Sequence, residues 1–576
     1  MPAALAARLT RREALCAGST LCLAAALPAQ SDPPGAAVAR LLAEATAKPR
    51  AMRDGSPPFS DPDGQKGHLP DNSHDFATAT AVRSKALANR AKHLRGRHLS
   101  QQDRETLEAL IWDLERDAGL APFYFHEFPL GYSGSQLASL NLHFITTPAD
   151  PDPAEYLARV RQVPAYVDNI RFRLLGQVER GLTVPRAEAV RALDQLRIET
   201  KELAATLRAA TDKGASPAFQ RDVQQFVEGP LAKAFAALEE TLRQRYIPRL
   251  TERSRMALAE DAPAYYRQLS QARVSDDLDL ASTHETAKDA LARIDAELAR
   301  LRKALGGPAD AAAFHRSMAG DPRWFVRDAE DLKSRLEAAI AQVTPLVPQY
   351  FTKLPTTPFR VAPLPDFLSG RLLNGYFSPP TKADPRGTYF YNTSHLDVAN
   401  WSWTKPLVSH ELMPGHHLAA ALLLETKGLP DYRRNLFVPA YAEGWGEYAR
   451  QLMEEAGLYK DDSWGLYASR LLERRFTLRT MVETGIHHPS WTWQQAAQDL
   501  ATDPLTRPET IQQLALSAAT FRSTGVLYWW GLRRFVELRA RAKRRAGAAF
   551  DIRRFHSQVM RGDNLPFPLI ERRVLG

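Results

Sequence analysis

The chain has 576 residues, of which 44% are hydrophobic and 24% are charged, and its formal net charge is +9. This length allows a large core divided among two to four domains, and the composition is that of an ordinary globular protein. The small excess of lysine and arginine is spread through helical stretches, apart from short clusters such as RAKRR at 541–545 that lack interleaved aromatic residues. Such clusters are typical of solvated helix faces, so nucleic acid is not an expected partner.

The first 30 residues resemble an export signal. Arginines at positions 8, 11 and 12 precede an apolar run from about Ala14 to Leu27, and small residues follow with a cleavage point expected after Ala29. The paired arginines suit the twin-arginine route, and the apolar run is too short to span a bilayer. We therefore expect residues 1–30 to be a signal peptide, and the mature protein to be periplasmic or secreted without stable membrane insertion. The alternative interpretation is a buried N-terminal helix.

Both cysteines, Cys16 and Cys22, lie inside this segment. Neither lies in a good lipobox, because Leu21 precedes Cys22 where a small residue is expected. Cleavage would leave a mature chain without disulfides, thiolate ligands or a cysteine nucleophile. Any metal site must then be built from His, Asp and Glu.

Residues 31–350 are predicted to form a helical scaffold. Apolar residues recur at helical spacing in four long segments, 103–119, 154–181, 231–255 and 287–307. A His-Glu pair occurs here at His284 and Glu285, but no second histidine lies within a turn of it. Ser282 and Glu285 instead fit a capping box at the start of the last segment, so His284 is not expected to bind metal.

Residues 351–576 differ in character and are predicted to form the catalytic region. The segment 374–397 is rich in proline, glycine and aromatic residues, and its 387–392 stretch (GTYFYN) is the best strand candidate. In zinc peptidases a strand in this position is often an edge that pairs with the substrate backbone, which makes Gly387 and Tyr389 candidate substrate contacts. The alternative is an ordinary edge strand packed on helices.

The following segment, SHELMPGHHLA at 409–419, starts like a zinc-protease helix. In H-E-x-x-H the two histidines share one helix face, but here proline occupies position 414. On a continuous helix His416 would point away from His410, and His417 would lie about 10 Å along the axis. Pro414 must break the helix near this point, and Gly415 permits unusual dihedral angles. Two looped-out residues would bring His416 to the metal and three would bring His417; we prefer His416.

A catalytic zinc site needs three protein ligands and an open position for water. Peptidases with a glutamate ligand supply it from a following antiparallel helix, and the helical segment 441–455 lies at about the right remove. Glu443 is the leading candidate for this ligand. Glu447, one turn later, is either its competitor or a partner of a ligand.

The chain resembles the DUF885 family, a group of uncharacterised bacterial proteins placed in the gluzincin peptidase clan. The resemblance rests on H-E-x-x-P-G-H-H at 410–417, E-G-W-x-x-Y at 443–448, Tyr376 to Pro380 followed by Gly387-Thr388-Tyr389, and Tyr528 to Gly531. It also rests on the block from Arg479 to His487, with Glu483 where the family usually has Asp, and on Phe555, His556 and Gly562. The stretch before Tyr528, FRSTGVL, lacks the Pro-x-Gln-Ala character common in the family, so substrate contacts there are expected to differ.

The resemblance implies a mainly α, cleft-forming fold of the gluzincin type, with a small β-sheet beside the active-site helix. It also implies a zinc metallopeptidase with His410, His416 and Glu443 as ligands and Glu411 as general base. Tyr528 resembles the late tyrosine that stabilises the oxyanion in related helical zinc peptidases, and His487 and His417 are its rivals.

Arg479 could pair with Glu483 one turn later, which we prefer, or bind a substrate carboxylate. The alternatives to a peptidase are a non-catalytic, helical peptide-binding protein and a zinc hydrolase of non-peptide amides or esters.

Overall fold

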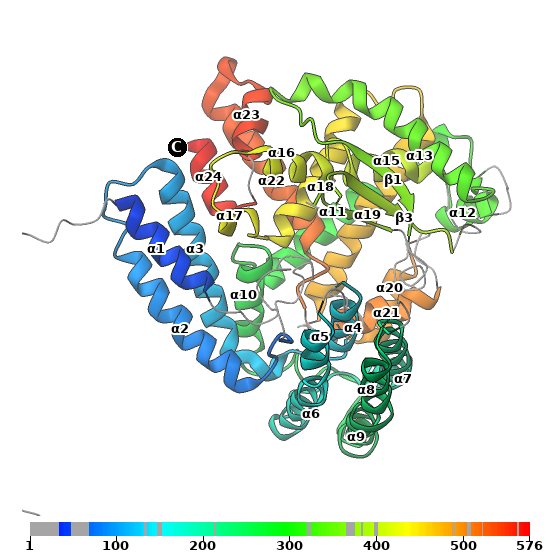
Figure 1. Ribbon diagram of the computed structural model, residues 1–576. Helices are drawn as coiled ribbons and strands as arrows, with labels where there is room; N and C mark the ends of the chain where they lie inside the picture. The colour runs from blue at the N-terminus through cyan, green and yellow to red at the C-terminus, as the bar shows by residue number, and fades with distance from the viewer. Residues whose placement is uncertain are drawn as a thin grey trace, which may run out of the picture.

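A computed structural model gives the fold (Figure 1). It describes residues 34–47, 68–131, 135–146, 152–211, 215–319, 324–364, 375–381, 384–394, 396, 401–486, 488, 490–503, 508–520, 522–561 and 564–576. The expected signal peptide at 1–30 lies outside the described residues.

The described secondary-structure elements of the N-terminal part of the chain are helices. Its α-helices are α1 (Pro34–Thr46), α2 (His74–Lys92), α3 (Gln101–Leu120), α4 (Gln136–Thr146), α5 (Pro153–Val160), α6 (Val163–Arg180), α7 (Arg186–Ala209), α8 (Pro217–Phe226), α9 (Ala232–Glu240), α10 (Ala262–Arg273), α11 (Leu280–Ala304), α12 (Ala311–Ala319) and α13 (Ala329–Val343).

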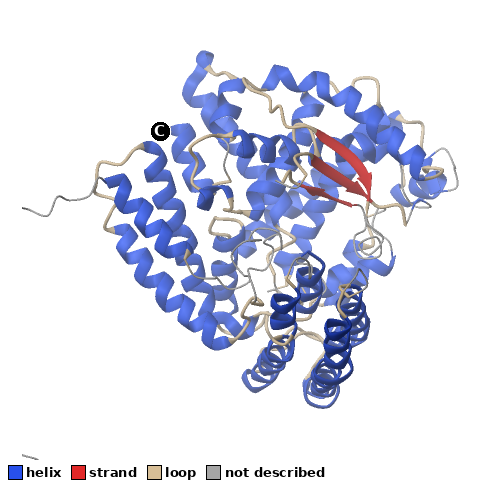
Figure 2. Cartoon of the chain, viewed as in Figure 1, coloured by secondary structure: helices blue, strands red, loops and turns tan. Residues whose placement is uncertain are grey.

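The C-terminal part contains a small sheet followed by further helices. The strands are β1 (Phe359–Pro363), β2 (Gly375–Ser378) and β3 (Gly387–Tyr391). The helices are α15 (Thr404–Glu411), α16 (His416–Glu425), α17 (Asp431–Arg434), α18 (Pro439–Glu455), α19 (Ser463–Gly485), α20 (Trp493–Leu500), α21 (Pro508–Ala519), α22 (Leu527–Ala546), α23 (Ile552–Val559) and α24 (Phe567–Leu575). The predicted mainly α fold with a small sheet is confirmed, as Figure 2 shows.

Two large hydrophobic cores organise the molecule. The larger core joins the N-terminal helices α1–α3 to the C-terminal helices, and contains Leu107, Leu336, Trp445 and Ile570. The second core fills the lobe of α4–α9 at the bottom of Figure 1. The larger core therefore takes residues from both sides of position 350, and a domain boundary there stays a prediction.

The helix boundaries differ from those expected where prolines or caps intervene. The predicted 154–181 helix is divided into α5 and α6, because Pro164 stands at the start of α6 and suits the first turn of a new helix. The 231–255 segment stops being helical after Arg249, just beyond Pro248. Proline supplies no backbone N–H, so a regular helix does not continue through it.

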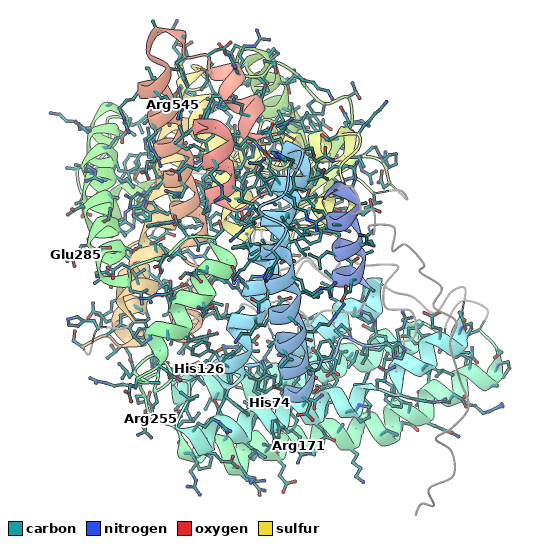
Figure 3. All side chains as sticks on the ribbon, turned by 90° about the vertical axis from the view of Figure 1, so that its left-hand side faces the viewer. His74, His126, Arg171, Arg255, Glu285 and Arg545 are labelled. Carbon is teal, nitrogen blue, oxygen red and sulfur yellow. The ribbon has the colours of Figure 1, made fainter. Side chains whose placement is uncertain are left out.

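Helix α11 begins three residues earlier than the capping box predicted. The side chain of Asp279 caps it by accepting a hydrogen bond from the backbone N–H of Ser282. Glu285 does not cap the helix; it lies on the outer face of α11 (Figure 3) and pairs with Lys288. The imidazole Nδ1 of His284 lies 3.0 Å from the carbonyl oxygen of Met481, so this histidine joins α11 to α19 and its expected structural role fits.

The sheet places β3 in the middle, which corrects the edge-strand prediction. β3 pairs with β1 in parallel and with β2 antiparallel. Both of its hydrogen-bonding edges are therefore in use and cannot accept a substrate backbone. Gly387 and Tyr389 are buried in this central strand, so the expected direct substrate contacts at these two residues are also corrected.

The basic cluster and the helix lengths bear on whether nucleic acid or a membrane is a partner. The basic cluster 541–545 lies at the end of α22, where Lys543, Arg544 and Arg545 are exposed (Figure 3). Among the residues that the structure describes, every helix is too short or too polar to cross a membrane.

Candidate metal centre

The helix carrying His410 breaks as the sequence requires. α15 ends at Glu411 and α16 begins at His416, with a four-residue turn between them. Pro414 cannot donate a hydrogen bond within a helix, and its ring would meet the carbonyl group of the residue four positions earlier. Gly415 is needed here, because a Cβ atom at this position would overlap the carbonyl oxygen of His410. The turn therefore lets the chain advance six residues while the two imidazoles stay close.

Helix α18 fixes the shape of this turn. The buried indole of Trp445 donates a hydrogen bond from Nε1 to the carbonyl oxygen of Pro414, over 2.9 Å. Pro414 lies between the end of α15 and the start of α16, so its carbonyl oxygen accepts no hydrogen bond within a helix. The tryptophan thus satisfies a backbone group that the break leaves free and ties the turn to the helix that carries Glu443.

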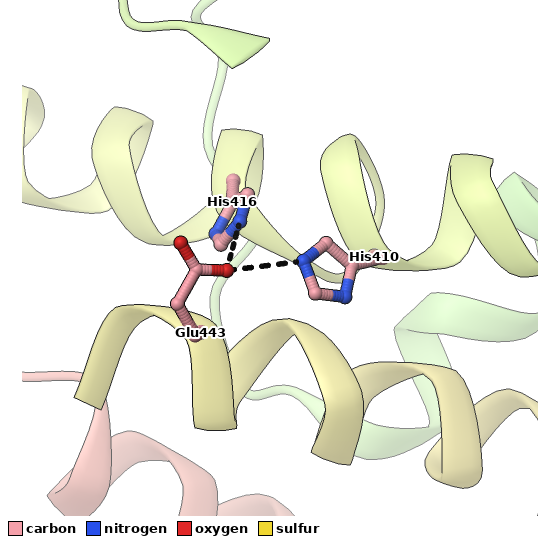
Figure 4. Close-up of side chains that lie close together, drawn as sticks. All are labelled: His410, His416 and Glu443. Atoms are coloured by element: carbon pink, nitrogen blue, oxygen red, sulfur yellow. Dashed lines mark ion pairs between the residues drawn. The ribbon is translucent and has the colours of Figure 1, made fainter. Parts of the chain in front are cut away.

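Three side chains converge across α15, α16 and α18 (Figure 4). Nε2 of His410 lies 3.5 Å and Nε2 of His416 lies 3.7 Å from the same oxygen, Oε2 of Glu443. One ligand atom from each of the three residues lies within 4.8 Å of the others. Two ligands at about 2.1 Å from one tetrahedral ion are roughly 3.4 Å apart, so these separations suit zinc. His410, His416 and Glu443 therefore form a site that could hold a metal ion.

Glu447 orients His410 rather than joining this cluster. Its Oε1 lies 2.9 Å from Nδ1 of His410, and its other oxygen accepts a hydrogen bond from Nε of Arg450, over 3.1 Å. Glu447 and Arg450 are both almost fully buried. A carboxylate only accepts, so Nδ1 of His410 carries the proton and Nε2 is left to face Glu443. This is the arrangement that metal-binding histidines commonly require.

The electrostatics of the cluster reflect a tightly paired, buried set of charges. Burial opposes the charge on His410, but hydrogen bonds to Glu443 and Glu447 outweigh it and raise the pKa of His410 to about 10. Burial opposes the charge on Glu443 as well, but hydrogen bonds from the imidazoles of His410 and His416 outweigh it and lower the pKa of Glu443. For Glu447 the desolvation is likewise outweighed, chiefly by Arg450, and its pKa is lowered. Both carboxylates are thus available as anions, as metal binding and histidine orientation need.

Two glycines of α18 make room for this arrangement. A Cβ atom at Gly446 would lie 2.6 Å from the ring of His410. A Cβ atom at Gly444 would overlap the backbone of Gly531 on α22, so this pair sets how closely the two helices approach. Between them stands Trp445, and on either side Glu443 and Glu447. Four positions of the E-G-W-G-E segment therefore contact the histidines or the turn between them, and Gly444 sets the approach of α22.

Glu411 and Tyr528 lie beside the cluster without belonging to it. Burial raises the pKa of the Glu411 carboxyl, and the neighbouring imidazoles of His410 and His416 oppose that rise. The Tyr528 ring stacks on Phe476, with centroids 4.0 Å apart, and lies 6.1 Å from the His410 ring. Burial and the charge of Glu443 hold the pKa of Tyr528 well above its ordinary value. Its hydroxyl is therefore a neutral donor, and it has no hydrogen-bond partner among the described residues.

His417 and His487 were the alternatives to Tyr528 for stabilising the oxyanion. His417 points from the site to the sheet, where its Nε2 donates to the carbonyl oxygen of Thr357 over 3.0 Å. Its ring is packed against Gly387, which has no side chain to exclude it. This corrects the expectation that His417 acts in catalysis, and the structure brings His416 rather than His417 to the cluster. His487 lies outside the described residues.

The preferred pairing of Arg479 with Glu483 is wrong. Glu483 is buried and uses one oxygen to accept from the hydroxyl of Tyr266 and the other to accept from the backbone N–H groups of Thr524 and Gly525. Arg479 instead places its guanidinium 5.9 Å from the centre of the Tyr528 ring. The atypical segment before Tyr528 thus binds Glu483 and leaves Arg479 beside the candidate site.

Sequence reasoning missed three contributors, Trp445, Gly446 and Phe476. For the first two a signal was present, because glycine inside a helix costs about 1 kcal/mol relative to alanine. Two glycines two residues apart within 441–455 therefore indicate close contacts on both sides of the tryptophan. For Phe476 no such signal exists, because an aromatic residue on a helix is compatible with many partners.

The comparisons with known proteins bear on family and fold. A family model described as "Bacterial protein of unknown function (DUF885)" matches residues 54–574. The chain belongs to the DUF885 family. No curated protein matches the sequence significantly.

Two solved structures share the fold of this DUF885 protein. A protein from Colwellia psychrerythraea, described as a "putative lipoprotein", has a TM-score of 0.78 at 19% identity over 94% of this chain and 98% of its own. A similarly described protein of unknown function from Shewanella oneidensis has a TM-score of 0.72 at 18% identity over 94% and 99%. A third structure, described as a "putative oligoendopeptidase F" from Bacillus anthracis, has a TM-score of only 0.29 at 12% identity over 86% of this chain and 94% of its own.

Proposed function

We propose that this DUF885 protein is a zinc-dependent hydrolase that cleaves peptides. The single observation that carries the proposal is the convergence of His410, His416 and Glu443, with Glu411 directly following the first of them in the chain. Two histidines and one glutamate are a donor set found in catalytic zinc sites, which keep a fourth position open. When bound there, zinc would lower the pKa of a coordinated water and polarise the carbonyl group of a substrate.

The chain's own residues supply the proton transfers that hydrolysis needs. In this proposal Glu411 accepts a proton from the attacking water and delivers it to the leaving nitrogen. The raised pKa of its carboxyl suits the first step, because a more basic carboxylate accepts a proton more readily. Glu447 holds the ring of His410 in the orientation that leaves Nε2 free.

Tyr528 completes the proposed machinery. Its hydroxyl is protonated and has no hydrogen-bond partner among the described residues, and its ring lies 6.1 Å from the ring of His410. Such a donor stabilises the negative charge that develops on the substrate oxygen, an effect commonly worth about 10²–10³ in kcat. The substrate is proposed to be a peptide or small amide, with no nucleic acid as partner.

The protein is also proposed to be exported. The support is the arginine-rich and then apolar pattern of residues 1–30. The lipoprotein description of the two similar structures is compatible with export. Whether the product is periplasmic or secreted, and by the twin-arginine route, stays a prediction.

The test compares the purified wild-type protein with Glu411→Gln. Bound metal is measured by mass spectrometry, and hydrolysis is followed on a mixed peptide library and on ester and non-peptide amide substrates. We expect about one zinc per chain in both proteins, and peptide cleavage by the wild type alone. Zinc in both proteins without any hydrolysis would favour a peptide-binding protein, and cleavage of esters or non-peptide amides alone would move the activity to that class.

A further inference from the structure

Helix α19 carries four arginines, and three of them have a carboxylate partner. Arg470 bonds to Glu297 and Glu473, Arg474 to Asp295 and Arg475 to Asp503. The fourth is Arg479, which has no ion pair or hydrogen bond from its guanidinium among the described residues. Within the described part of the chain, every arginine of this helix except Arg479 therefore has a carboxylate partner.

The position of Arg479 relates it to the centre through Tyr528. Its guanidinium lies 5.9 Å from the centre of the Tyr528 ring, and that ring lies 6.1 Å from the ring of His410. Together these distances place the guanidinium no more than 12.0 Å from the centre of the His410 ring. Arg479 is neither fully buried nor fully exposed, so a ligand can reach it and be partly desolvated there.

The carboxylate nearest in sequence is unavailable to Arg479. Glu483, one turn later on α19, is held by Tyr266, Thr524 and Gly525. A partly buried guanidinium without a counter-ion is costly unless an anion binds it, and its planar shape favours a carboxylate. The missing partner is therefore most simply supplied by the substrate.

We propose that Arg479 binds the free carboxyl terminus of a peptide substrate, so that the enzyme removes one or two residues from that end. The inference rests on the proposed hydrolase function. A peptide chain covers about 3.3–3.6 Å per residue when extended. After allowance for the ion pair at one end and the metal at the other, a separation of at most 12.0 Å from the His410 ring leaves room for no more than about two residues beyond the cleaved bond. A carboxylate on an acidic side chain has the same chemistry and is the alternative that the experiment must separate.

The test uses three N-acetylated hexapeptides on the metal-loaded protein. The first ends in a free carboxylate and contains no acidic residue, the second is its C-terminal amide, and the third is an amide with one aspartate near its end. Products are identified by mass spectrometry. We expect the free acid to be cut near its C-terminus. For the amide, kcat/KM should fall about a hundredfold, because the charge of the Arg479 guanidinium would then have no carboxylate to pair with.

Substitution of the arginine gives the second arm. Arg479→Met should remove the preference for the free acid, and Arg479→Lys should keep part of it. The matched control is Arg533→Met on α22, where Arg533 stacks on Trp529 and Trp530 and makes no contact with the candidate centre. Circular dichroism and zinc content should be unchanged in all three variants.

A binding measurement separates failure of this inference from failure of the proposed function. Affinities of the acid and the amide are measured by calorimetry on Glu411→Gln, with and without Arg479→Met. Tighter binding of the acid that depends on Arg479 supports the carboxylate site even if the wild type cleaves nothing. Equal cleavage and equal binding of acid and amide would overturn it while leaving hydrolysis intact. A preference for the aspartate-containing amide would overturn the assignment to the chain terminus.

Discussion

The indole Nε1 of Trp445 lies 2.9 Å from the carbonyl oxygen of Pro414, so one hydrogen bond joins the glutamate-bearing helix to the turn between the two histidines. Without this bond the turn would be held only by its own backbone and by packing. The relative positions of His410 and His416 therefore depend on a residue that touches neither imidazole in a hydrogen bond.

Replacement of Trp445 by phenylalanine should weaken metal binding with little loss of stability. The variant keeps an aromatic ring in the core but leaves the carbonyl group of Pro414 unsatisfied, which costs about 1–3 kcal/mol. We expect zinc affinity to fall about tenfold in competition with a chelator. The matched control is Trp491→Phe, which removes an equivalent hydrogen bond from the Trp491 indole to the carbonyl oxygen of Val482, 3.1 Å away. A control that loses as much affinity would contradict the role given to Trp445.

Replacement of Gly446 by alanine should displace the imidazole of His410. The added methyl group would lie 2.6 Å from that ring, and the hydrogen bond between Glu447 and Nδ1 restricts how far the ring can move. We expect zinc affinity to fall at least a hundredfold while helicity is unchanged, because alanine favours a helix more than glycine does. Gly229→Ala is the control, since no atom lies within 4 Å of the added methyl group there. Normal zinc content in Gly446→Ala would show that His410 is not a ligand.

Glu447→Gln should reduce both metal affinity and stability. The amide can still contact Nδ1 of His410, but it no longer balances the buried charge of Arg450. Loss of a residue that orients a metal ligand commonly costs about 10–100-fold in metal affinity. Breaking a buried ion pair costs up to about 3–5 kcal/mol, and we expect a smaller loss here because Glu473 still lies 3.8 Å from Arg450. Chemical denaturation of the metal-free variant isolates the second effect.

The control for Glu447 lies on the same helix. Glu455→Gln breaks the half-exposed ion pair between Glu455 and Arg539, which is worth at most about 1 kcal/mol. We expect it to bind zinc normally. If both variants lost stability equally, the buried ion pair between Glu447 and Arg450 would contribute no more to stability than the half-exposed one.

The protein should lose stability as the pH falls from about 6.5 towards 4, in part through His556. This buried histidine donates from Nδ1 to the carbonyl oxygen of Tyr350 and accepts at Nε2 from the hydroxyl of Tyr448. Burial lowers its pKa from 6.5 to about 4. Between these values the unfolded chain binds a proton that the folded chain does not, so stability falls with falling pH, by about 3 kcal/mol for a shift of this size.

The measurement compares the free energy of unfolding of wild type and His556→Gln at pH 7.5, 6 and 4.5. The variant is expected to be less stable at pH 7.5, since it disturbs two hydrogen bonds. Its stability should nevertheless fall less steeply with pH, because the titrating group has been removed. Parallel curves for the two proteins would mean that other groups carry the acid sensitivity.

Local sequence predicted the candidate centre to a large extent. A proline and a glycine between His410 and His416 cannot be accommodated in a regular helix, whatever surrounds them, so the break was predictable from covalent geometry. Apolar periodicity in the same way predicted several of the long helices, including α3 and α11, although prolines and caps moved helix ends by several residues. The long helices α7 and α19 were not among the predicted segments.

Several features could not be predicted, because each depends on partners distant in the chain. The sequence of residues 387–391 predicts an edge strand, but β1 and β2 pair with its two sides. Arg479 and Glu483 have the spacing of a helical ion pair, but Tyr266 and the backbone of 524–525 take the carboxylate first. Spacing along the chain therefore shows which contacts a residue could make. It does not show which of several possible partners the residue binds in the folded protein.

The sequence by itself determined that a helix must break between two histidines, because proline and glycine act on the backbone within one turn. Only the tertiary structure decided that His416 rather than His417 joins His410 and that Glu443 completes the cluster while Glu447 orients His410. It also decided that the guanidinium of Arg479 has no ion pair or hydrogen bond with any residue that the structure describes. Those outcomes depend on how α18, α19 and α22 pack against the break, and long-range packing is set by the whole core rather than by neighbours in the chain.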